Sequence, residues 1–310
     1  MRKKIFIDGK AGTTGLRIEE RLSGRDDVEI ISLPDELRKD PKARKSMLNE
    51  ADFVFLCLPD AAAIEAVSMI ENENTVVIDA STAHRTNPDW SYGFPELSSE
   101  FLEKIQGSNR IAVPGCHASG FIALVYPLVK AGILSEDSLL TVHSITGYSG
   151  GGKSMIADYN DEDRSALLGA PRQYGIKQSH KHLPEMAKIT GLNNAPLFSP
   201  IVADFYSGME VTVPLFKSQL KSGGIEEVKN IYRSLYTTDI VHFTENADES
   251  GFLSAAALSG KDSMQVEVYG NDDRIILVAR YDNLGKGASG AAVECLNIKL
   301  GCGRAKTLVI

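Results

Sequence analysis

Residues 5–16 read Ile5-Phe6-Ile7-Asp8-Gly9-Lys10-Ala11-Gly12-Thr13-Thr14-Gly15-Leu16. A short apolar run suited to a buried strand leads into three glycines, and a helix-periodic segment begins at Thr13. Glycine permits a tight turn and lets a phosphate approach the backbone, while the amino terminus of a helix offers N–H groups and the positive end of the helix dipole. The segment therefore predicts a nucleotide-binding turn formed by Gly9, Gly12, Thr13, Thr14 and Gly15.

The spacing of these glycines leaves a second interpretation open. The pattern is GxxGxxG rather than GxGxxG, and it lacks the GK[ST] ending of an ATP-type phosphate loop. Three glycines at this place can also serve only to let a strand and a helix pack closely. Their position after a strand and before a helix favours the nucleotide interpretation.

The first 115 residues alternate short apolar runs with helix-periodic segments. The apolar runs are typical of parallel strands buried on both faces, and they cover residues 4–8, 28–33, 53–58, 76–79 and 110–113. Helices are predicted between them at residues 13–22, 41–50 and 60–71. This order predicts a doubly wound, Rossmann-like parallel sheet.

The pattern changes after about residue 135, where β-rich segments predominate. They cover residues 138–147, 201–215, 240–244, 263–270 and 274–281, with a helix predicted at 225–236. Apolar and polar residues alternate from Met264 to Val268, as in an antiparallel sheet with one covered face. We therefore expect an α/β protein in which the Rossmann-like domain is followed by an α+β domain with a mostly antiparallel sheet. The predicted boundaries are 1–115 for the first domain, completed by a carboxyl-terminal helix within 287–310, and 116–286 for the second.

Composition excludes several classes of protein. The 310 residues carry 33 basic and 41 acidic side chains, and the resulting net charge of −8 disfavours binding to nucleic acid or to an anionic membrane. The apolar run at the amino terminus is too short for a secretory signal, and no run has the length of a membrane span. Four cysteines without a CxxC pair indicate a reducing cytoplasm rather than a disulfide scaffold or a zinc site.

The second predicted strand ends without the acidic residue that usually holds the ribose hydroxyl of NAD. It ends instead in Ser32 and Leu33, and four cations follow it: Arg38, Lys39, Arg44 and Lys45. This combination favours the 2′-phosphate of NADP, with Ser32 and Arg38 as contacts. Any one of these cations can equally belong to a solvated helix face.

Cys116 lies in the segment Pro114-Gly115-Cys116-His117-Ala118-Ser119, between a short strand and an apolar helical run. A thiol at the amino terminus of a helix is stabilised as a thiolate, and the N–H groups there can also hold an oxyanion. The other cysteines, Cys57, Cys295 and Cys302, are expected to be packing residues.

Candidates for a base lie in the segment Ser179-His180-Lys181-His182-Leu183-Pro184-Glu185. If a helix begins near Leu183, Glu185 lies where it can orient an imidazole from the preceding loop. A metal site is disfavoured because a third convincing ligand is absent.

Two further segments have a composition suited to binding an anion or part of a cofactor. Residues 146–154 combine flexible glycines with Ser149 and Lys153, and residues 282–290 place small residues before the last helix. Each segment alone can be an ordinary flexible turn.

In combination, these motifs resemble the N-acetyl-γ-glutamyl-phosphate reductases of arginine biosynthesis, and specifically their shorter subgroup. The resemblance spans essentially the whole chain, through residues 9–15, 79–85, 113–119, 147–153, 180–186 and 283–290. One departure is His117, because the family usually carries Tyr after the cysteine. That departure leaves the nucleophile in place but adds a titratable group beside it.

The resemblance implies NADPH-dependent conversion of N-acetyl-glutamyl 5-phosphate to the semialdehyde through a thioester on Cys116. It implies His182 as the proton shuttle with Glu185 orienting it, and His180 as a substrate contact or the alternative base. The other implied contacts are Arg85, Ser149 and Lys153 for the substrate and Asn283, Lys286 and Gly287 for the nicotinamide side of NADP(H). The family also implies a homo-oligomer, either a dimer or a tetramer.

Three alternatives stay open at this point. A related acyl-phosphate reductase, acting on aspartate semialdehyde or an amino-adipate counterpart, uses the same chemistry, and the sequence does not show which side chains measure substrate length. A Cys–His hydrolase needs no nucleotide turn. An NADP-sensing binding protein needs no nucleophile.

Overall fold

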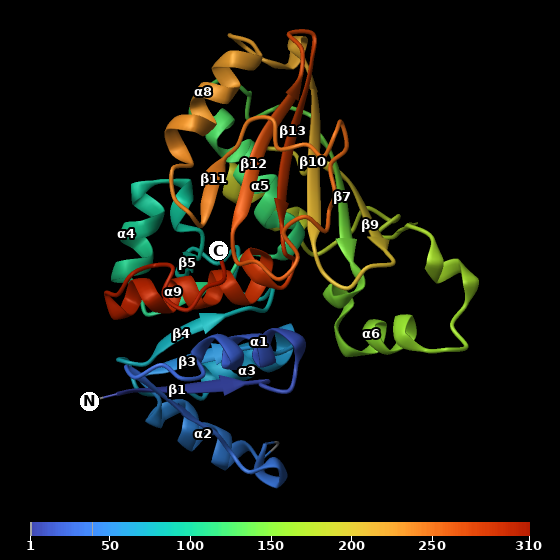
Figure 1. Ribbon diagram of the computed structural model, residues 1–310. Coiled ribbons are helices and arrows are strands. Elements are labelled where there is room, and N and C mark those ends of the chain that lie inside the picture. Colours follow the sequence, from blue (N-terminus) through green and yellow to red (C-terminus); the bar gives the residue numbers. More distant parts are fainter. Residues whose placement is uncertain (1, 39) are drawn as a thin grey trace. The chain divides into compact units, whose positions relative to one another are not determined.

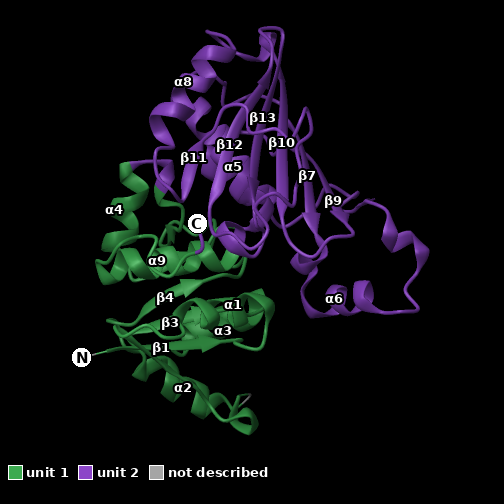
Figure 2. Ribbon diagram, viewed as in Figure 1, with its two compact units in different colours: residues 1–95, 99–114, 288–308 green, residues 96–98, 115–287, 309–310 purple. Residues whose placement is uncertain are grey.

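The computed structural model describes residues 2–38 and 40–310, so Lys39 lies outside the described residues. The chain divides into two compact units, which Figures 1 and 2 show. Unit 1 comprises residues 1–95, 99–114 and 288–308, and unit 2 comprises residues 96–98, 115–287 and 309–310. Unit 1 is therefore built from both ends of the chain.

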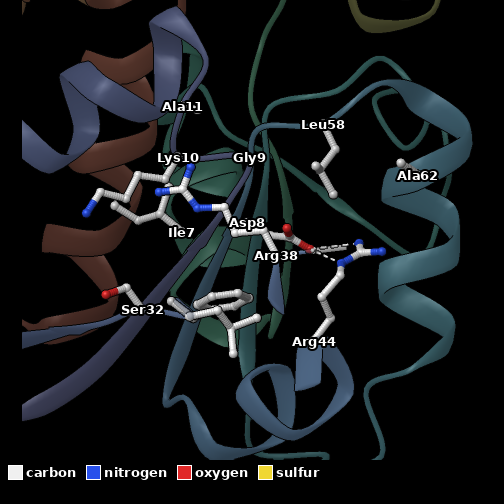
Figure 3. Close-up of a pocket in the computed structure, with 12 residues that line it drawn as sticks. Ile7, Asp8, Gly9, Lys10, Ala11, Ser32, Arg38, Arg44, Leu58 and Ala62 are labelled. Carbon is white, nitrogen blue, oxygen red and sulfur yellow. Dashed lines mark hydrogen bonds and ion pairs between the residues drawn. The ribbon is translucent and has the colours of Figure 1, made fainter. Parts of the chain in front are cut away.

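Unit 1 contains a six-stranded sheet in the order β2-β1-β3-β4-β6-β5, and every paired strand runs parallel to its neighbour. Its strands are β1 (Lys3–Asp8), β2 (Val28–Ile31), β3 (Phe53–Leu56), β4 (Val76–Asp79), β5 (Ser91–Tyr92) and β6 (Arg110–Ala112). Its helices are α1 (Thr13–Leu22), α2 (Pro41–Glu50), α3 (Asp60–Ser68), α4 (Ser99–Gly107) and α9 (Gly290–Leu300). The turn between β1 and α1 appears in Figure 3.

Both faces of this sheet are buried, which explains why its strands are almost continuously apolar. On one face, Ile5 and Ile78 pack with Ala292 and Leu296 of α9 in a single apolar cluster. On the other face, Phe6, Val54 and Val77 pack with small residues of α3. The last helix is thus part of the core of unit 1.

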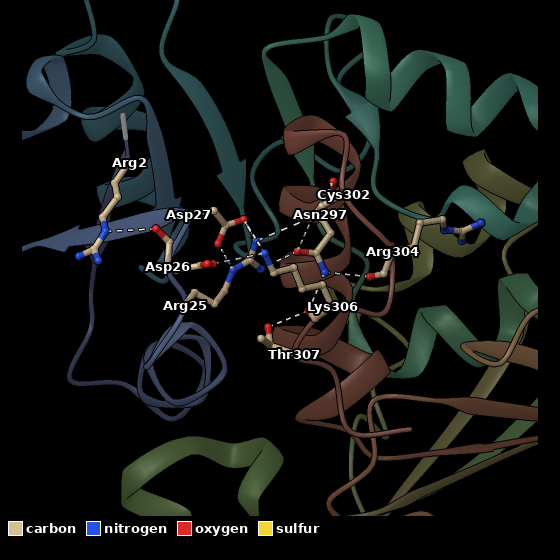
Figure 4. Close-up of polar contacts among 9 residues, drawn as sticks. All are labelled: Arg2, Arg25, Asp26, Asp27, Asn297, Cys302, Arg304, Lys306 and Thr307. Atoms are coloured by element: carbon tan, nitrogen blue, oxygen red, sulfur yellow. Dashed lines mark hydrogen bonds and ion pairs between the residues drawn. The ribbon is translucent and has the colours of Figure 1, made fainter.

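A polar cluster joins the end of the chain to the loop between α1 and β2, as Figure 4 shows. Arg25 donates to Asn297 on α9 at 2.6 Å and to both carboxylate oxygens of Asp27 at 2.9 and 2.8 Å. The Asn297 amide donates to the carbonyls of Arg304 and Lys306 at 2.8 Å. The Arg25 guanidinium holds the pKa of Asp27 well below its usual range.

Unit 2 contains a seven-stranded sheet in the order β11-β12-β13-β10-β7-β9-β8. The pairs β7/β9 and β11/β12 are parallel and the other four pairs are antiparallel. Its strands are β7 (Thr141–Gly147), β8 (Arg172–Gln173), β9 (Leu197–Ala203), β10 (Met209–Phe216), β11 (Val241–Phe243), β12 (Met264–Gly270) and β13 (Arg274–Tyr281). Its helices are α5 (Cys116–Lys130), α6 (Gly152–Asn160), α7 (Leu183–Thr190) and α8 (Ile225–Leu235).

The apolar helix α5 packs against β10 and β13 and is the central helix of unit 2 (Figure 1). Two buried tyrosines of the α8 region reach it: the Tyr236 hydroxyl donates to the carbonyl of Ala123 at 2.6 Å, and the Tyr232 hydroxyl donates to that of Leu124. These two hydrogen bonds attach the middle of α5, the helix that begins at Cys116, to the α8 region.

The predicted fold class is confirmed, with corrections to individual elements. The apolar segment predicted as one β-rich run at 201–215 is two strands, β9 and β10, because Gly208 turns between them with φ +129°. The last helix begins at Gly290, and residues Gly285–Ser289 form a π-helical turn before it. Helices α4 and α6 are not predicted from the sequence, nor are the two-residue strands β5 and β8, which are too short to carry a pattern.

Short helical turns complete the described part of the chain, at Asp35–Leu37, Pro95–Leu97, Tyr148–Gly151, Ala166–Gly169 and Lys217–Gln219. Among the residues that the structure describes, no helix combines the length and the apolar character needed to cross a bilayer.

Candidate active site

The turn between β1 and α1 has no room for side chains at its glycines. Gly9 has φ +85°, and a Cβ there would lie 2.3 Å from the carbonyl oxygen of Cys57. A Cβ on Gly15 would lie 2.8 Å from the Gly9 carbonyl oxygen. Gly12 caps α1 without any side-chain hydrogen bond, so the first N–H groups of the helix are left for another acceptor.

A pocket of about 300 Å³ opens beside this turn, and Figure 3 shows its walls. Ser32 and Arg38, both expected to contact the cofactor, line it together with residues of the turn. Arg44 also lines it, but its guanidinium is bound to Asp8 at 2.9 Å in the same pocket. Arg38 pairs with the exposed Asp35 and remains about half exposed.

A second pocket of about 180 Å³ is lined by Gly12, Thr13, Thr14 and neighbouring residues at the ends of β3 and β4. The two pockets lie at the carboxyl ends of parallel strands, where dinucleotides bind in doubly wound sheets. The glycine cradle, the uncapped helix and the cation-lined pocket fit a nicotinamide dinucleotide.

Cys116 is the first residue of α5, and its side chain is partly exposed. Gly115 is the N-cap of this helix and provides no side-chain cap. The N–H of Gly115 instead donates to the Glu185 carboxylate at 2.8 Å. Glu185 lies in the first turn of α7, so its carboxylate holds the starts of the two helices together.

His182 is the N-cap residue of α7 and is buried. Its backbone N–H donates to Nδ1 of His180 at 3.2 Å, and the centroids of the two imidazole rings lie 4.7 Å apart. Burial and the nearby Lys181 lower the pKa of His180. The two histidines expected to share the base and substrate roles therefore lie together.

His117, which departs from the usual family residue, lies against the same pair. Its ring centroid is 5.7 Å from that of His182 and 6.0 Å from that of His180. Its Nδ1 and Nε2 atoms each lie 2.6 Å from a hydroxyl, those of Ser144 and Tyr174. Burial, with a smaller effect from His180, lowers the pKa of His117 to about 3. The ring is therefore neutral at pH 7 and accepts from one hydroxyl while donating to the other.

The segment from Asp282 to Gly287 forms a fixed loop. Asp282 accepts hydrogen bonds from the Ser207 hydroxyl at 2.9 Å and from the N–H groups of Gly260 and Leu284 at 2.5 and 2.7 Å. A Cβ on Gly287 would lie 3.2 Å from the Cβ of Cys116. The absence of a side chain at Gly287 thus lets this loop approach the cysteine closely.

Two residues of this loop, both expected to line the nicotinamide, are engaged inside unit 2. Asn283 donates to the Ser149 hydroxyl at 3.0 Å and accepts from the N–H of Gly208 at 2.9 Å. Lys286 is buried and its ammonium group lies 2.9 Å from the carboxylate of Glu96, which is also buried. Both side chains therefore hold the loop in shape.

The remaining predicted substrate contacts differ in setting. Lys153 is exposed on α6, and Ser149 is buried at the end of β7. Arg85 belongs to unit 1, where its guanidinium donates to the carbonyls of Val113 and Ala80 at 2.9 and 3.0 Å. Part of its donor set therefore stabilises the loops of unit 1.

Sequence reasoning missed two tyrosines of this site. Tyr174 contacts His117, and the hydroxyl of Tyr281 donates to the carbonyl of Cys116 at 2.5 Å. A tyrosine in a strand or loop carries no local signal of such a contact. Within residues 2–38 and 40–310, no group of three or more His, Cys, Asp or Glu side chains is arranged to hold a metal ion.

Comparisons with known proteins agree with this geometry. Residues 12–105 match the family model described as semialdehyde dehydrogenase, NAD binding domain, and residues 116–283 match the one described as semialdehyde dehydrogenase, dimerisation domain. The N-acetyl-gamma-glutamyl-phosphate reductase of Sinorhizobium medicae is 44% identical, covering 97% of this chain and 99% of that protein. The chain belongs to the N-acetyl-γ-glutamyl-phosphate reductases. The enzyme of the same name from Brucella ovis is 46% identical, covering 97% of this chain and all of that protein.

Solved structures of low identity share the fold. Aspartate semialdehyde dehydrogenase II from Vibrio cholerae superposes with a TM-score of 0.73 at 17% identity, covering 97% of this chain and 99% of that chain. Aspartate semialdehyde dehydrogenase with NADP from Candida albicans superposes with a TM-score of 0.66 at 16% identity, covering 96% of this chain and 98% of that chain.

Membership of the N-acetyl-γ-glutamyl-phosphate reductases confirms the family expected from the sequence, the oxidoreductase class and a nicotinamide cofactor. It sets aside the hydrolase and the sensor as primary functions. The match of unit 2 residues to a dimerisation domain agrees with an oligomer.

Proposed function

We propose that this reductase converts N-acetyl-glutamyl 5-phosphate to N-acetyl-glutamate 5-semialdehyde with NADPH, the third step of arginine biosynthesis, through a thioester on Cys116. The observation that carries the proposal is the hydrogen bond from the Gly115 N–H to Glu185. It joins the helix start that bears Cys116 to the helix start that bears His182. A nucleophile and a histidine base are the groups that acyl transfer needs.

Cys116 has the setting of an activated thiol. A thiolate at the first residue of α5 is favoured by the helix dipole and by the N–H groups of the first turn. Its sulfur attacks the acyl-phosphate carbonyl, a C–S bond forms, and the C–O bond to phosphate breaks with its electron pair leaving on phosphate. The same N–H groups stabilise the oxyanion of the tetrahedral intermediate.

Proton transfer is assigned to His182. After reduction of the thioester carbon, the alkoxide of the thiohemiacetal is protonated by the imidazolium and later deprotonated by the imidazole, whereupon the C–S bond breaks and the aldehyde leaves. Through its bond to Gly115, Glu185 links the start of α7, which His182 caps, to the start of α5, which bears Cys116. We assign no proton transfer to His117, because a pKa lowered to about 3 makes its imidazole a weak base at pH 7.

The cofactor is assigned to unit 1. Bound NADPH supplies the hydride that reduces the thioester. The turn residues Gly9, Gly12, Thr13, Thr14 and Gly15 would hold the pyrophosphate, with Ser32 and Arg38 at the 2′-phosphate. Asn283, Lys286 and Gly287 would line the nicotinamide side of the cofactor. The side chains of Asn283 and Lys286 also shape the loop whose Gly287 approaches Cys116.

The proposed substrate carries a phosphate and a carboxylate, so cationic side chains that bind it would offset the net charge of −8 locally. We assign Lys153, Ser149, His180 and Arg85 to these anions. We further propose that the protein is a homodimer or homotetramer assembled through unit 2, and that it works in the cytoplasm, where a free thiolate is maintained.

The test is the reverse reaction, with semialdehyde, phosphate and NADP, followed by the appearance of reduced cofactor. Cys116→Ser is expected to abolish turnover while NADP still raises the melting temperature. Cys295→Ser is the matched control, because Cys295 is a fully buried thiol of α9 that lines neither cofactor pocket.

Substrate choice is tested in the same assay with the one-carbon-longer semialdehyde and with aspartate semialdehyde. Preference for either would replace the proposed substrate with that of a related reductase. Full turnover in Cys116→Ser would refute the covalent mechanism.

A further inference from the structure

His117, the second residue of α5, connects two hydroxyl groups through the two nitrogens of its ring. Nδ1 lies 2.6 Å from the hydroxyl oxygen of Ser144 on β7, and Nε2 lies 2.6 Å from that of Tyr174, which directly follows β8. A neutral imidazole accepts a hydrogen bond at one nitrogen and donates one at the other. The three side chains therefore form a hydrogen-bonded chain that has a direction.

The burial of Ser144 determines that direction. Ser144 is fully buried, and among the residues that the structure describes its hydroxyl has no hydrogen-bond partner besides Nδ1 of His117. If Nδ1 carried the ring proton, the serine hydrogen would be buried without an acceptor, and such a group is costly to bury. The serine hydroxyl therefore donates to Nδ1, and the single proton of the neutral ring is on Nε2.

This arrangement leaves the hydrogen of the Tyr174 hydroxyl directed away from His117. Nε2–H donates to the phenolic oxygen, so the phenolic hydrogen cannot also be donated back to Nε2. In the described part of the chain, His117 is the one hydrogen-bond partner of this hydroxyl. Tyr174 is thus a donor whose acceptor has to come from outside the chain.

The Tyr174 hydroxyl belongs to the site of the nucleophile. The side chain is half-buried, and its ring centroid lies 6.1 Å from that of His180, which we assign to the anionic groups of the substrate. Burial, with a smaller effect from the Cys116 thiolate, raises the pKa of Tyr174. The hydroxyl therefore keeps its hydrogen near pH 7 and lies within electrostatic reach of Cys116.

We propose that Ser144 and His117 orient the Tyr174 hydroxyl as a hydrogen-bond donor to an anionic oxygen of the substrate, either of its carboxylate or of its phosphate. Tyr174 is the residue that touches the substrate, and Ser144 and His117 are positioning residues. The proposal rests on the proposed function, which brings this substrate to Cys116. A donor that is directed before the substrate arrives needs no reordering on binding.

The first experiment locates the ring proton of His117 in the unmodified enzyme without substrate. The chain has six histidines, so protein labelled with ¹⁵N at histidine gives a simple two-bond ¹H–¹⁵N correlation spectrum. The variant His117→Gln identifies the signals of this ring by their loss. We expect a proton on Nε2 and none on Nδ1, and a proton on Nδ1 would overturn the proposal.

The second experiment removes the donor with Tyr174→Phe and measures the reverse reaction. We expect KM to rise about ten- to hundredfold for one reactant, the value of a hydrogen bond to a charged group, with kcat within about threefold. A rise for the semialdehyde identifies the carboxylate as the acceptor, and a rise for inorganic phosphate identifies the phosphate. Alkylation of Cys116 by iodoacetamide should stay within about twofold, because the hydroxyl is assigned to the substrate and not to the thiolate.

Tyr236→Phe is the matched control for that substitution. Tyr236 is a buried tyrosine of unit 2 whose hydroxyl donates to the carbonyl of Ala123, so its loss removes a hydroxyl of the protein interior. We expect both KM values to stay within about twofold in this variant. Unchanged KM values in Tyr174→Phe, equal changes in the two variants, or slower alkylation of Cys116 in Tyr174→Phe would overturn the proposal.

The positioning role of His117 is tested by a double-mutant cycle. His117→Phe should raise the same KM about three- to tenfold in the unmodified enzyme and hardly at all in Tyr174→Phe, because the hydroxyl that it orients is then absent. Independent effects of the two substitutions would overturn that role. If His117→Phe does not fold, the position of the ring proton and the Tyr174→Phe kinetics still decide. Failure of the proposed function is separate, because it would appear as full turnover in Cys116→Ser.

Discussion

The nucleotide turn of unit 1 and the cysteine site of unit 2 are built in opposite ways. The turn itself consists of residues 9–15, packed against the backbone of Cys57, and its shape depends on side chains that are missing. The cysteine site depends on side chains that are present and come from far along the chain: Glu185 is 70 positions from Gly115, and Tyr281 is 165 positions from Cys116. The first kind of site is specified locally, and the second exists only when the unit has folded.

The largest effect is expected at the histidine pair of the cysteine site. His182→Gln should lower kcat by about 10² to 10⁴, the usual contribution of a positioned acid or base. His117→Gln should lose less activity and keep the shape of the pH–rate profile, because His117 does not titrate near pH 7. Stopped-flow and steady-state rates from pH 5 to 9 distinguish the two; loss of the acidic limb in His117→Gln would contradict the assignment.

A methyl group in the nucleotide turn should weaken cofactor binding by unit 1 without affecting unit 2. Gly15→Ala places a Cβ 2.8 Å from the Gly9 carbonyl oxygen, and overpacking of this kind costs about 1–3 kcal/mol. We expect NADPH affinity, measured by calorimetry, to fall about tenfold or more while the rate of Cys116 alkylation stays unchanged.

Gly107→Ala is the control for that substitution, since a Cβ at the end of α4 meets nothing within 4 Å. Comparable loss of NADPH binding in the two variants would mean that the turn tolerates the methyl group and that the observed loss has another origin.

The cofactor pocket should distinguish NADPH from NADH through one cation. Arg38→Ala is expected to weaken NADPH binding about tenfold, the value of one charge-assisted hydrogen bond, and to leave NADH binding unchanged. Arg44 is already bound to Asp8, so it offers less to a phosphate. Lys45→Ala removes an exposed cation of α2 that pairs with Glu71, and it should change neither affinity. If Arg38→Ala weakens the binding of NADPH and NADH equally, Arg38 does not contact the 2′-phosphate.

The smallest effect is expected at the polar cluster of Figure 4. Asp27 has a pKa below its ordinary value of 3.8 because of Arg25, so the unfolded chain binds more protons near pH 3 and the stabilisation is lost as pH falls below 3.8. Asp27→Asn should cost about 1 kcal/mol of unfolding free energy at pH 7, and this difference should shrink steadily as the pH falls from 4 to 2.

Asp26→Asn is the neighbouring control for that measurement, because the Asp26 side chain is almost fully exposed and lies 3.9 Å from Lys306. Denaturation in urea at several pH values measures both variants. A pH-independent cost in Asp27→Asn would show that the charge of Asp27 does not stabilise unit 1.

The sequence alone predicts most of the local structure and less of the cysteine site. Apolar runs buried on both faces identify the parallel strands, and Cys116 is recognisable because Pro and Gly precede it and an apolar helix follows. The same pattern does not predict which distant side chains form hydrogen bonds with the start of that helix. Glu185 was expected to orient an imidazole, and nothing in the sequence indicates that its carboxylate also accepts a hydrogen bond from the N–H of Gly115.

Lys286 illustrates the same limit. The family resemblance implies that Lys286 lines the nicotinamide, and nothing in the local sequence shows that its ammonium group also forms a buried pair with Glu96, 190 positions away. Local sequence shows which polar side chains could bind a ligand. Only the packing of distant segments determines which of these side chains also bond to other residues of the protein.

The discontinuity of unit 1 has a consequence for synthesis of the protein on the ribosome. The apolar cluster around Ile5 and Ile78 is completed by α9, and the Cys116 carbonyl meets its partner only when Tyr281 has been made. A nascent chain must therefore emerge almost entirely before either unit can close, although its amino-terminal strands leave the ribosome first. The start of α5, which bears Cys116, therefore gains its contact with Tyr281 only late in synthesis of the chain.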